Sequence, residues 1–312
     1  MREASAFSPG HITGFFQICD ELEDPLLKGS RGAGVCLSKG MHSTVRLEPA
    51  VKSSLEVKIN GCSTTSAVVS EYVAKTMLSR AKGNYEVAVE HWVEVPIGVG
   101  MGTSGAGALS LALALNDALD LGMSREEAAQ VAHIAEVECK TGLGTIIAET
   151  YGGMEIRVKS GAPGVGEIMR VPLRGEYVVV CLPFGQIPTR SILTDELYRK
   201  RINELGGLFV EELLSKPEPE EFMRLSRRFA EHVGLITERV RGVLEETDET
   251  GLPCSMPMFG EAVFSLLKRG DAEDLMAIFR RHQTPSVSVS EIDEVISSII
   301  LAEVDEEGVR LI

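Results

Sequence analysis

The chain has 312 residues, of which 44% are hydrophobic and 25% are charged; this composition is typical of a globular protein long enough for two domains. The formal net charge is −15, which argues against a surface that wraps nucleic acid. The six cysteines lie far apart without a C-x-x-C pair. Zinc ligation and a disulfide framework are therefore not indicated, and a cytoplasmic location is expected.

The first hundred residues alternate between apolar and polar side chains in three places, which predicts strands with one covered face. These strands are expected at residues 44–47, 55–59 and 85–95. A helix-like pattern lies between the last two of them, at residues 66–80. The first half of the chain is therefore expected to mix strands and helices.

A glycine-rich stretch, PIGVGMGTSG at residues 96–105, comes directly before a helix that is expected to run to about Leu121. So much backbone freedom suits a ligand that approaches the backbone closely. A helix N-terminus carries unpaired N–H groups and a partial positive charge, so the expected ligand is an anion such as phosphate. The apolar part of this helix begins near Ala106 and is too short to span a bilayer, so no membrane partner is expected.

A capping box starts the next helix, because Ser124 is a good N-cap and Glu127 follows three residues later. Helix formers then dominate residues 194–243, with breaks expected at 215–217 and near Gly234. A domain boundary near residue 174 divides the chain into expected domains at 1–174 and 175–312. Strands of the second domain are expected at 177–182, 262–267, 286–289 and 309–312.

Three interpretations of the glycine-rich stretch fit poorly. The Walker A motif needs a lysine after its last glycine, and none is present. Residues 100–105 match the G-x-G-x-x-G dinucleotide pattern. A Rossmann fold also needs a second strand with an acidic residue about 20 residues further on, but residues 121–140 have the pattern of a helix. A simple helix-packing turn explains neither Pro96 nor the hydroxyl pair at 103–104.

The stretch instead resembles the phosphate loop of the GHMP kinases, such as galactokinase, homoserine kinase and mevalonate kinase, usually written P-x-G-x-G-L-G-S-S-A. Ser8-Pro9-Gly10-His11 resembles the first family motif, A-P-G-R/K. The third motif should lie near Gly251 to Gly260, where GLPCSMPMFG is poor in glycine. The residues that the resemblance implies as ATP ligands are Pro96, Gly98, Gly100, Met101, Gly102, Thr103, Ser104 and Gly105.

This resemblance implies an α+β, two-domain GHMP kinase fold. The N-terminal domain would be a ribosomal-protein-S5-like nucleotide-binding domain, and the C-terminal domain a ferredoxin-like α/β domain.

Four longer stretches are similar to archaeal pantoate kinases, namely 8–16, 29–37, 101–116 and 135–145. That family transfers the γ-phosphate of ATP to the 4-hydroxyl of (R)-pantoate in archaeal coenzyme A biosynthesis, and the resemblance implies this function here. Two alternatives stay open. One is another small-molecule kinase of the family, such as homoserine kinase, and the other is a non-catalytic metabolite-binding regulator on the same fold. The sequence is compatible with a homodimer but does not reveal the oligomeric state.

Ser104 and Glu136 match the residues that bind Mg²⁺ in the family, and Mg²⁺ prefers such oxygen ligands. Glu138 is a rival, because an insertion or deletion would shift the alignment. Galactokinase and mevalonate kinase place a catalytic aspartate where this chain has Thr145. Thr145 either orients the substrate hydroxyl or starts a helix, and transfer without an aspartate base is plausible because a loose transition state asks little of the nucleophile.

Two residues are candidates for binding the substrate carboxylate. Arg31 lies between glycines, and its planar guanidinium suits a bidentate pair with a carboxylate, although a surface arginine in a turn has the same sequence pattern. His11 occupies the place where relatives carry lysine or arginine. It either donates a hydrogen bond to a carboxylate or phosphate, or packs at a turn.

Overall fold

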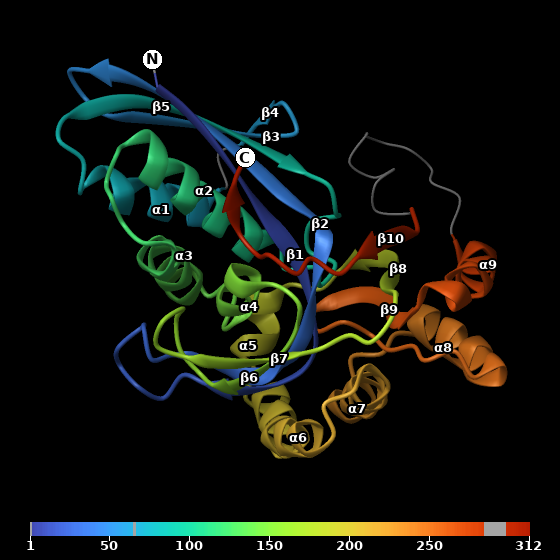
Figure 1. The fold of residues 1–312 in the computed structure, drawn as a ribbon. Coiled ribbons are helices and arrows are strands. Elements are labelled where there is room, and N and C mark those ends of the chain that lie inside the picture. Colours follow the sequence, from blue (N-terminus) through green and yellow to red (C-terminus); the bar gives the residue numbers. More distant parts are fainter. Residues whose placement is uncertain (1, 65–66, 284–297) are drawn as a thin grey trace.

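The computed structural model describes residues 2–64, 67–283 and 298–312. In these ranges an eight-stranded sheet and a three-stranded sheet are flanked by helices (Figure 1). The structure has the mixed α and β content expected from the sequence. The strand expected at 286–289 lies outside the described residues.

A long antiparallel hairpin of β1 (Arg2–Cys19) and β2 (Gly29–Ala50) runs through the larger sheet (Figure 1). The C-terminal part of β2 pairs with β5 (Asn84–Val93), and its N-terminal part pairs with β6 (Met154–Lys159). Only residues 44–47 of this hairpin were expected as a strand. The rest was missed because its glycines and its burial on both faces remove the polar alternation of an exposed strand.

Two helices pack on one face of the larger sheet, a third packs on these two helices, and a fourth, shorter helix packs against β1 and β2 (Figure 1). They are α1 (Val68–Leu78), α2 (Thr103–Ala118), α3 (Arg125–Cys139) and α4 (Thr145–Tyr151). The capping box of Ser124 and Glu127 is present at the start of α3 and confirms the sequence prediction. The remaining strands of this sheet are β3 (Ser54–Ile59), β4 (Cys62–Ser63), β7 (Glu167–Val171) and β11 (Arg310–Leu311).

Helix α2 is apolar nearly all round because it lies between the sheet and two other helices. Almost every residue from Thr103 to Leu115 is buried, and such all-round apolar character is typical of a core helix. Among the described residues, none of the helices combines the length and the apolar character needed to cross a membrane.

The smaller sheet has the strand order β10–β8–β9, and the last three helices of the second half of the chain contact it, whereas the longest helix of that half packs on the hairpin of β1 and β2. Its strands are β8 (Tyr177–Gln186), β9 (Gly260–Lys268) and β10 (Ile300–Glu303). The helices are α5 (Thr189–Leu193), α6 (Glu196–Ser215), α7 (Pro219–Val233), α8 (Glu238–Thr250) and α9 (Ala272–His282), with the short turn η1 (Arg269–Asp271).

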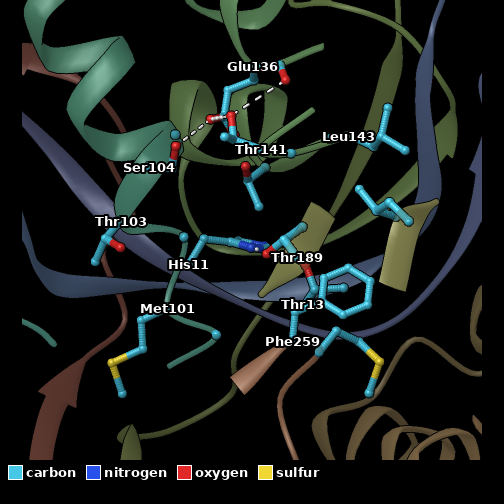
Figure 2. Close-up of a pocket in the computed structure, with 18 of the residues that line it drawn as sticks. His11, Thr13, Met101, Thr103, Ser104, Glu136, Thr141, Leu143, Thr189 and Phe259 are labelled. Carbon is cyan, nitrogen blue, oxygen red and sulfur yellow. Dashed lines mark hydrogen bonds between the residues drawn. The ribbon is translucent and has the colours of Figure 1, made fainter. Parts of the chain in front are cut away.

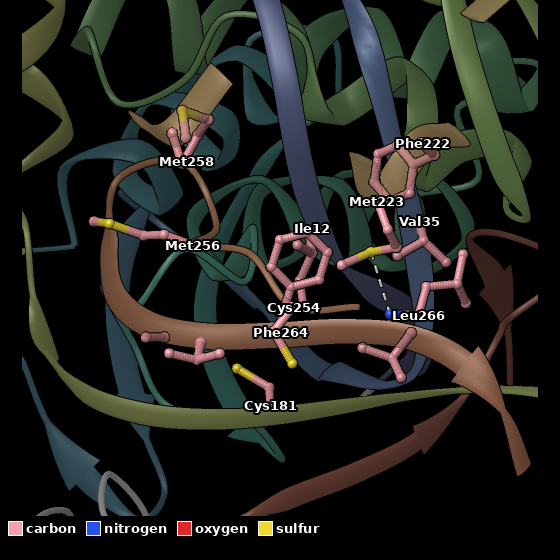
Figure 3. Packing of buried hydrophobic residues seen from close by; sticks show 14 of the residues in the cluster. Ile12, Val35, Cys181, Phe222, Met223, Cys254, Met256, Met258, Phe264 and Leu266 are labelled. Atoms are coloured by element: carbon pink, nitrogen blue, oxygen red, sulfur yellow. Dashed lines mark hydrogen bonds between the residues drawn. The ribbon is translucent and has the colours of Figure 1, made fainter. Parts of the chain in front are cut away.

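The two halves of the chain share a hydrophobic core. Ile12 and Val35 of the long hairpin belong to the same buried cluster as Phe222 of α7 and Phe264 of β9 (Figure 3). In addition, β11 at the end of the chain pairs with β1. The boundary near residue 174 therefore divides the chain in sequence only. The elements α6, α7 and β11 follow it in the chain and contact β1, which precedes it. This shared core fixes the two walls of the cavity described next.

Candidate active site

A cavity of about 340 Å³ lies between the two halves of the molecule (Figure 2). It is bounded by β1, the phosphate loop (residues 96–105), the connection from α3 to α4, the short helix α5 and the loop before β9. Figure 2 shows Ser104, Glu136 and Thr141 at one end, and Thr13 with Phe259 at the other.

The phosphate loop presents backbone rather than side chains to the cavity. Gly100 and Gly102 have φ values of 83° and 66°, in the left-handed region that favours glycine. A Cβ at Gly100 would lie 3.0 Å from the Met258 carbonyl oxygen, and a Cβ at Gly102 would lie 2.5 Å from Glu149 Oε1. Gly102 is the N-cap of α2 and no side chain caps this helix end, so its N–H groups suit an anion.

All but one of the residues expected to bind ATP line the cavity. Pro96 is buried and does not line it. The residues that do line it are Gly98, Gly100, Met101, Gly102, Thr103, Ser104 and Gly105.

Ser104 and Glu136 meet at one end of the cavity, although they lie on different helices. Ser104 Oγ and Thr141 Oγ1 each donate a hydrogen bond of 2.6 Å to Glu136 Oε1 (Figure 2). Burial raises the pKa of Glu136, while these two hydrogen bonds oppose that rise. A hydroxyl beside a carboxylate is a hard oxygen donor set of the kind that Mg²⁺ prefers. The rival Glu138 is exposed and does not line the cavity.

The buried cation in the cavity wall is Arg157, on β6, which the sequence analysis missed. Arg157 Nη1 donates a 2.7 Å hydrogen bond to Glu155 Oε1, and His11 Nε2 lies 3.2 Å from the same oxygen. All three side chains are almost completely buried. Irregular pairing of β1 on both sides of His11 and Ile12 accompanies this arrangement.

One hydrogen-bond donor in this cluster is left without a partner among the described residues. Thr13 Oγ1 lies 3.3 Å from His11 Nδ1 and accepts a 3.5 Å hydrogen bond from Arg157 Nη2. Among the described residues, Arg157 Nε has no hydrogen-bond partner. Burial lowers the pKa of Arg157, and the neighbouring Glu155 opposes that change, but a guanidinium stays charged in proteins.

Arg31 lies elsewhere. Its Nε donates to the Val158 carbonyl oxygen at 2.7 Å, and its Nη2 pairs with Glu211 on α6 at 2.5 Å. Arg31 does not line the cavity, because its register on β2 turns the side chain toward α6. The sequence did not single out Arg157, because Met154–Lys159 alternates between apolar and charged residues, a pattern that equally fits a strand with an exposed polar face.

Thr145 is the first residue of α4 and lines the cavity. Its hydroxyl oxygen is buried and has no hydrogen-bond partner among the described residues. Glu149, one turn later, is fully buried, and neither of its carboxylate oxygens has a partner in that part of the chain. Burial, followed by the charges of Glu136 and Glu155, raises the pKa of Glu149 well above its usual range. The sequence analysis missed Glu149, whose only signal was a carboxylate in an apolar helix.

Comparisons with known proteins identify the family of this chain. Residues 67–153 match the model of the GHMP kinases N-terminal domain. The chain is 38% identical to a pantoate kinase of Thermococcus kodakarensis, over 86% of this chain and 89% of that one. It is 34% identical to a pantoate kinase of Methanocaldococcus jannaschii, over 88% of this chain and 96% of that one.

A solved structure described as a phosphotransferase related to the CoA biosynthesis pathway is 34% identical to this chain, with a TM-score of 0.87 and coverage of 99% of this chain and 98% of that one. The likeness extends over both halves of the molecule, so the chain has the GHMP kinase fold expected from its motifs. Together with the kinases of the two archaea, it shows that the chain belongs to the pantoate kinase family of the GHMP kinases.

Proposed function

We propose that this chain transfers the γ-phosphoryl group of ATP to the 4-hydroxyl of D-pantoate. The observation that carries the proposal is the buried Arg157 in a cavity that is also lined by the glycine-rich phosphate loop at the N-terminus of α2. One cavity therefore offers a site for a polyphosphate and a separate site for a small carboxylate. The names of the relatives in the pantoate kinase family support the same reaction.

The substrate end of the cavity suits the chemistry of pantoate, which carries a carboxylate, two hydroxyls and two geminal methyl groups. Arg157 supplies charge for the carboxylate. The hydroxyls of Ser30 and Thr189 line the same cavity, and the side chains of Phe16 and Leu193 provide apolar surface. Glu155 balances the charge of Arg157 when the site is empty, which reduces the cost of burying that cation.

The nucleotide end suits a triphosphate. The backbone N–H groups of residues 100–105 and the dipole of α2 would hold the phosphates. Ser104 and Glu136 would hold Mg²⁺, which neutralises phosphate charge when it is bound. Their hydroxyl and carboxylate oxygens fit that ion, and Thr141 fixes the Glu136 carboxylate in place.

Phosphoryl transfer depends mainly on positioning and charge stabilisation. No carboxylate occupies the place of the family's catalytic aspartate, where Thr145 stands. The Thr145 hydroxyl is buried and has no hydrogen-bond partner in the part of the chain that the structure describes, so it would be able to bond to the attacking hydroxyl and orient it. We therefore propose that Thr145 positions the substrate and that the reaction proceeds without an aspartate base.

We propose that the reaction takes place in the cytoplasm. All six cysteines are free, two of them at the partly exposed positions 19 and 139 and one, Cys62, exposed. Unpaired thiols of this kind are typical of a reducing compartment.

An assay of ATP consumption with a panel of hydroxy acids tests the proposed function. We expect phosphorylation of D-pantoate, none of neutral pantolactone, and a much lower kcat/KM for homoserine. The lactone would leave Arg157 without its carboxylate, and homoserine lacks two methyl groups, each of which contributes roughly 1 kcal/mol of binding. A kcat/KM for homoserine equal to or above that for pantoate would overturn the substrate, and no ATP consumption with any acid would favour a non-catalytic regulator.

A further inference from the structure

Phe259 has a backbone conformation that aromatic residues rarely adopt. Its φ is 64°, in the left-handed region. The other non-glycine residues with positive φ in the described ranges are Asn60, Asp120 and Lys140. Asparagine and aspartate tolerate this region and Lys140 ends α3, so Phe259 is the unusual case. It also lies in the third family motif, where a glycine-rich sequence was expected.

Contacts on both sides hold this conformation in place. The Met258 N–H donates a 3.1 Å hydrogen bond to the Thr13 carbonyl oxygen on β1. On the other side, a Cβ at Gly260 would lie 2.0 Å from the Val99 carbonyl carbon and oxygen, so this backbone packs directly against the phosphate loop. A strained residue that is fixed by its surroundings in this way often serves a functional site.

The ring of Phe259 lines the cavity at the same end as Arg157. It packs edge-on against Phe16, with ring centroids 5.5 Å apart and planes at 82°. Phe16 Cβ and Arg157 Nη2 both lie 2.8 Å from the position of a Cβ at Gly32, so Phe16 and Arg157 are neighbours. Figure 2 shows Phe259 beside Thr13 and away from Ser104 and Glu136.

We propose that the ring of Phe259 determines specificity by contacting the geminal methyl groups of the substrate; this inference rests on the proposed function. The ring is half-buried and available from the cavity. Its apolar surface packs on Phe16, which neighbours Arg157, so a small substrate whose carboxylate pairs with Arg157 would have its apolar part near this ring. A glycine at this position would remove the strain and also the surface, which gives the chain a physical reason to keep a strained aromatic residue.

The test compares two substrates in two variants. D-pantoate is compared with 2,4-dihydroxybutanoate, which is the same acid without the two methyl groups. In Phe259→Gly we expect the preference for D-pantoate, measured as the ratio of the two kcat/KM values, to fall at least about tenfold. The fall should come from pantoate alone, while kcat/KM for the smaller acid and the KM for ATP stay within about twofold.

Phe259→Asn is the second variant, because asparagine tolerates the left-handed backbone while it removes the ring; the same loss of preference is expected. Asp120→Gly is the matched control, because it places glycine at another positive-φ position, which does not line the cavity. This change should leave the ratio of the two kcat/KM values unchanged. An equal loss for both acids would show a purely structural role. A rise in the KM for ATP alone would show that the ring contacts the nucleotide, and either result overturns the proposal.

A different result would overturn the proposed function itself. If the wild-type enzyme does not phosphorylate D-pantoate, the proposed function is overturned and this inference falls with it. If the wild-type enzyme does so and the variants keep its preference, only the role of Phe259 is overturned.

Discussion

The two ends of the cavity are built in different ways. The phosphate loop consists of ten consecutive residues and, as proposed, would bind through backbone N–H groups, so it requires glycine where side chains have no room. The substrate end uses side chains from β1, β6, α5 and the loop before β9, which are far apart in the chain. The first end depends on local conformation, whereas the second depends on the register of the strands and on the shared core between the two halves.

Charge differs between the ends as well. Arg157 is a buried cation that Glu155 already balances at 2.7 Å. At the nucleotide end the side chains of Ser104 and Glu136 add a hydroxyl and a carboxylate, and the positive groups that line the cavity there are the N-terminus of α2 and Lys140, next to Thr141. Substitutions at the two ends should therefore alter different kinetic constants.

The largest effect is expected at the nucleotide end. Ser104→Ala and Glu136→Gln should each lower kcat by about 10²–10³-fold, the range seen when one group that stabilises transition-state charge is removed. Steady-state kinetics and circular dichroism check activity and folding together. Glu138→Gln is the matched control, because this exposed glutamate is on the same helix, and it should retain nearly normal turnover. Loss in Glu138→Gln with normal turnover in Glu136→Gln would contradict the assignment.

A smaller effect is expected for Thr145, which lines the cavity beside Gly105. Thr145→Ala should lower kcat by about tenfold, less than Ser104→Ala does, because it removes a positioning hydrogen bond and not a base. Thr145→Ser keeps the hydroxyl and should stay close to the wild-type rate. Activity at background level in a folded Thr145→Ala enzyme would show that the hydroxyl is essential to the chemistry.

The smallest effect should appear in stability rather than in rate. Glu149 is buried without a partner in the described residues, and its pKa is raised, first by burial. The folded state then keeps a proton that the unfolded state loses above about pH 4.5, so the free energy of unfolding falls as pH rises, by up to about 1.4 kcal/mol per pH unit. Urea unfolding from pH 5 to pH 8 should show this fall in the wild type.

Glu149→Gln has no such group to titrate, so its unfolding free energy should depend less on pH over the same interval. The two proteins should differ most at pH 8, where the wild type is penalised, and least at pH 5. Parallel pH profiles for the two proteins would show that the Glu149 carboxyl is not perturbed by its surroundings.

The sequence was sufficient to predict most of the residues of the glycine-rich stretch that line the cavity, because that stretch is contiguous. A proline, spaced glycines and a hydroxyl pair fall within residues 96–105, and Glu136 follows on a helix whose capping box is also local. The breaks between α6, α7 and α8 were similarly visible, at Pro217 and Gly234. Each of these features depends on short-range conformation.

The substrate end was harder to predict because pairing between distant segments creates it. The long hairpin of β1 and β2 has too many glycines and too little polar alternation to be recognised as strands. Without that hairpin and its pairing to β6, no local pattern places Arg157 beside His11 or turns Arg31 toward α6. Phe259 was hidden for a further reason, since a positive φ at an aromatic residue contradicts ordinary preference.

The most direct test of separate substrate and nucleotide ends in the cavity compares Arg157→Lys with Arg31→Lys in two-substrate kinetics. Both changes keep the charge and remove the planar fork that pairs with a carboxylate. We expect Arg157→Lys to raise the KM for D-pantoate about 10–100-fold with the KM for ATP within about twofold, and Arg31→Lys to leave both constants unchanged. If Arg31→Lys raises the KM for D-pantoate while a folded Arg157→Lys enzyme keeps the wild-type value, the substrate carboxylate does not bind at Arg157.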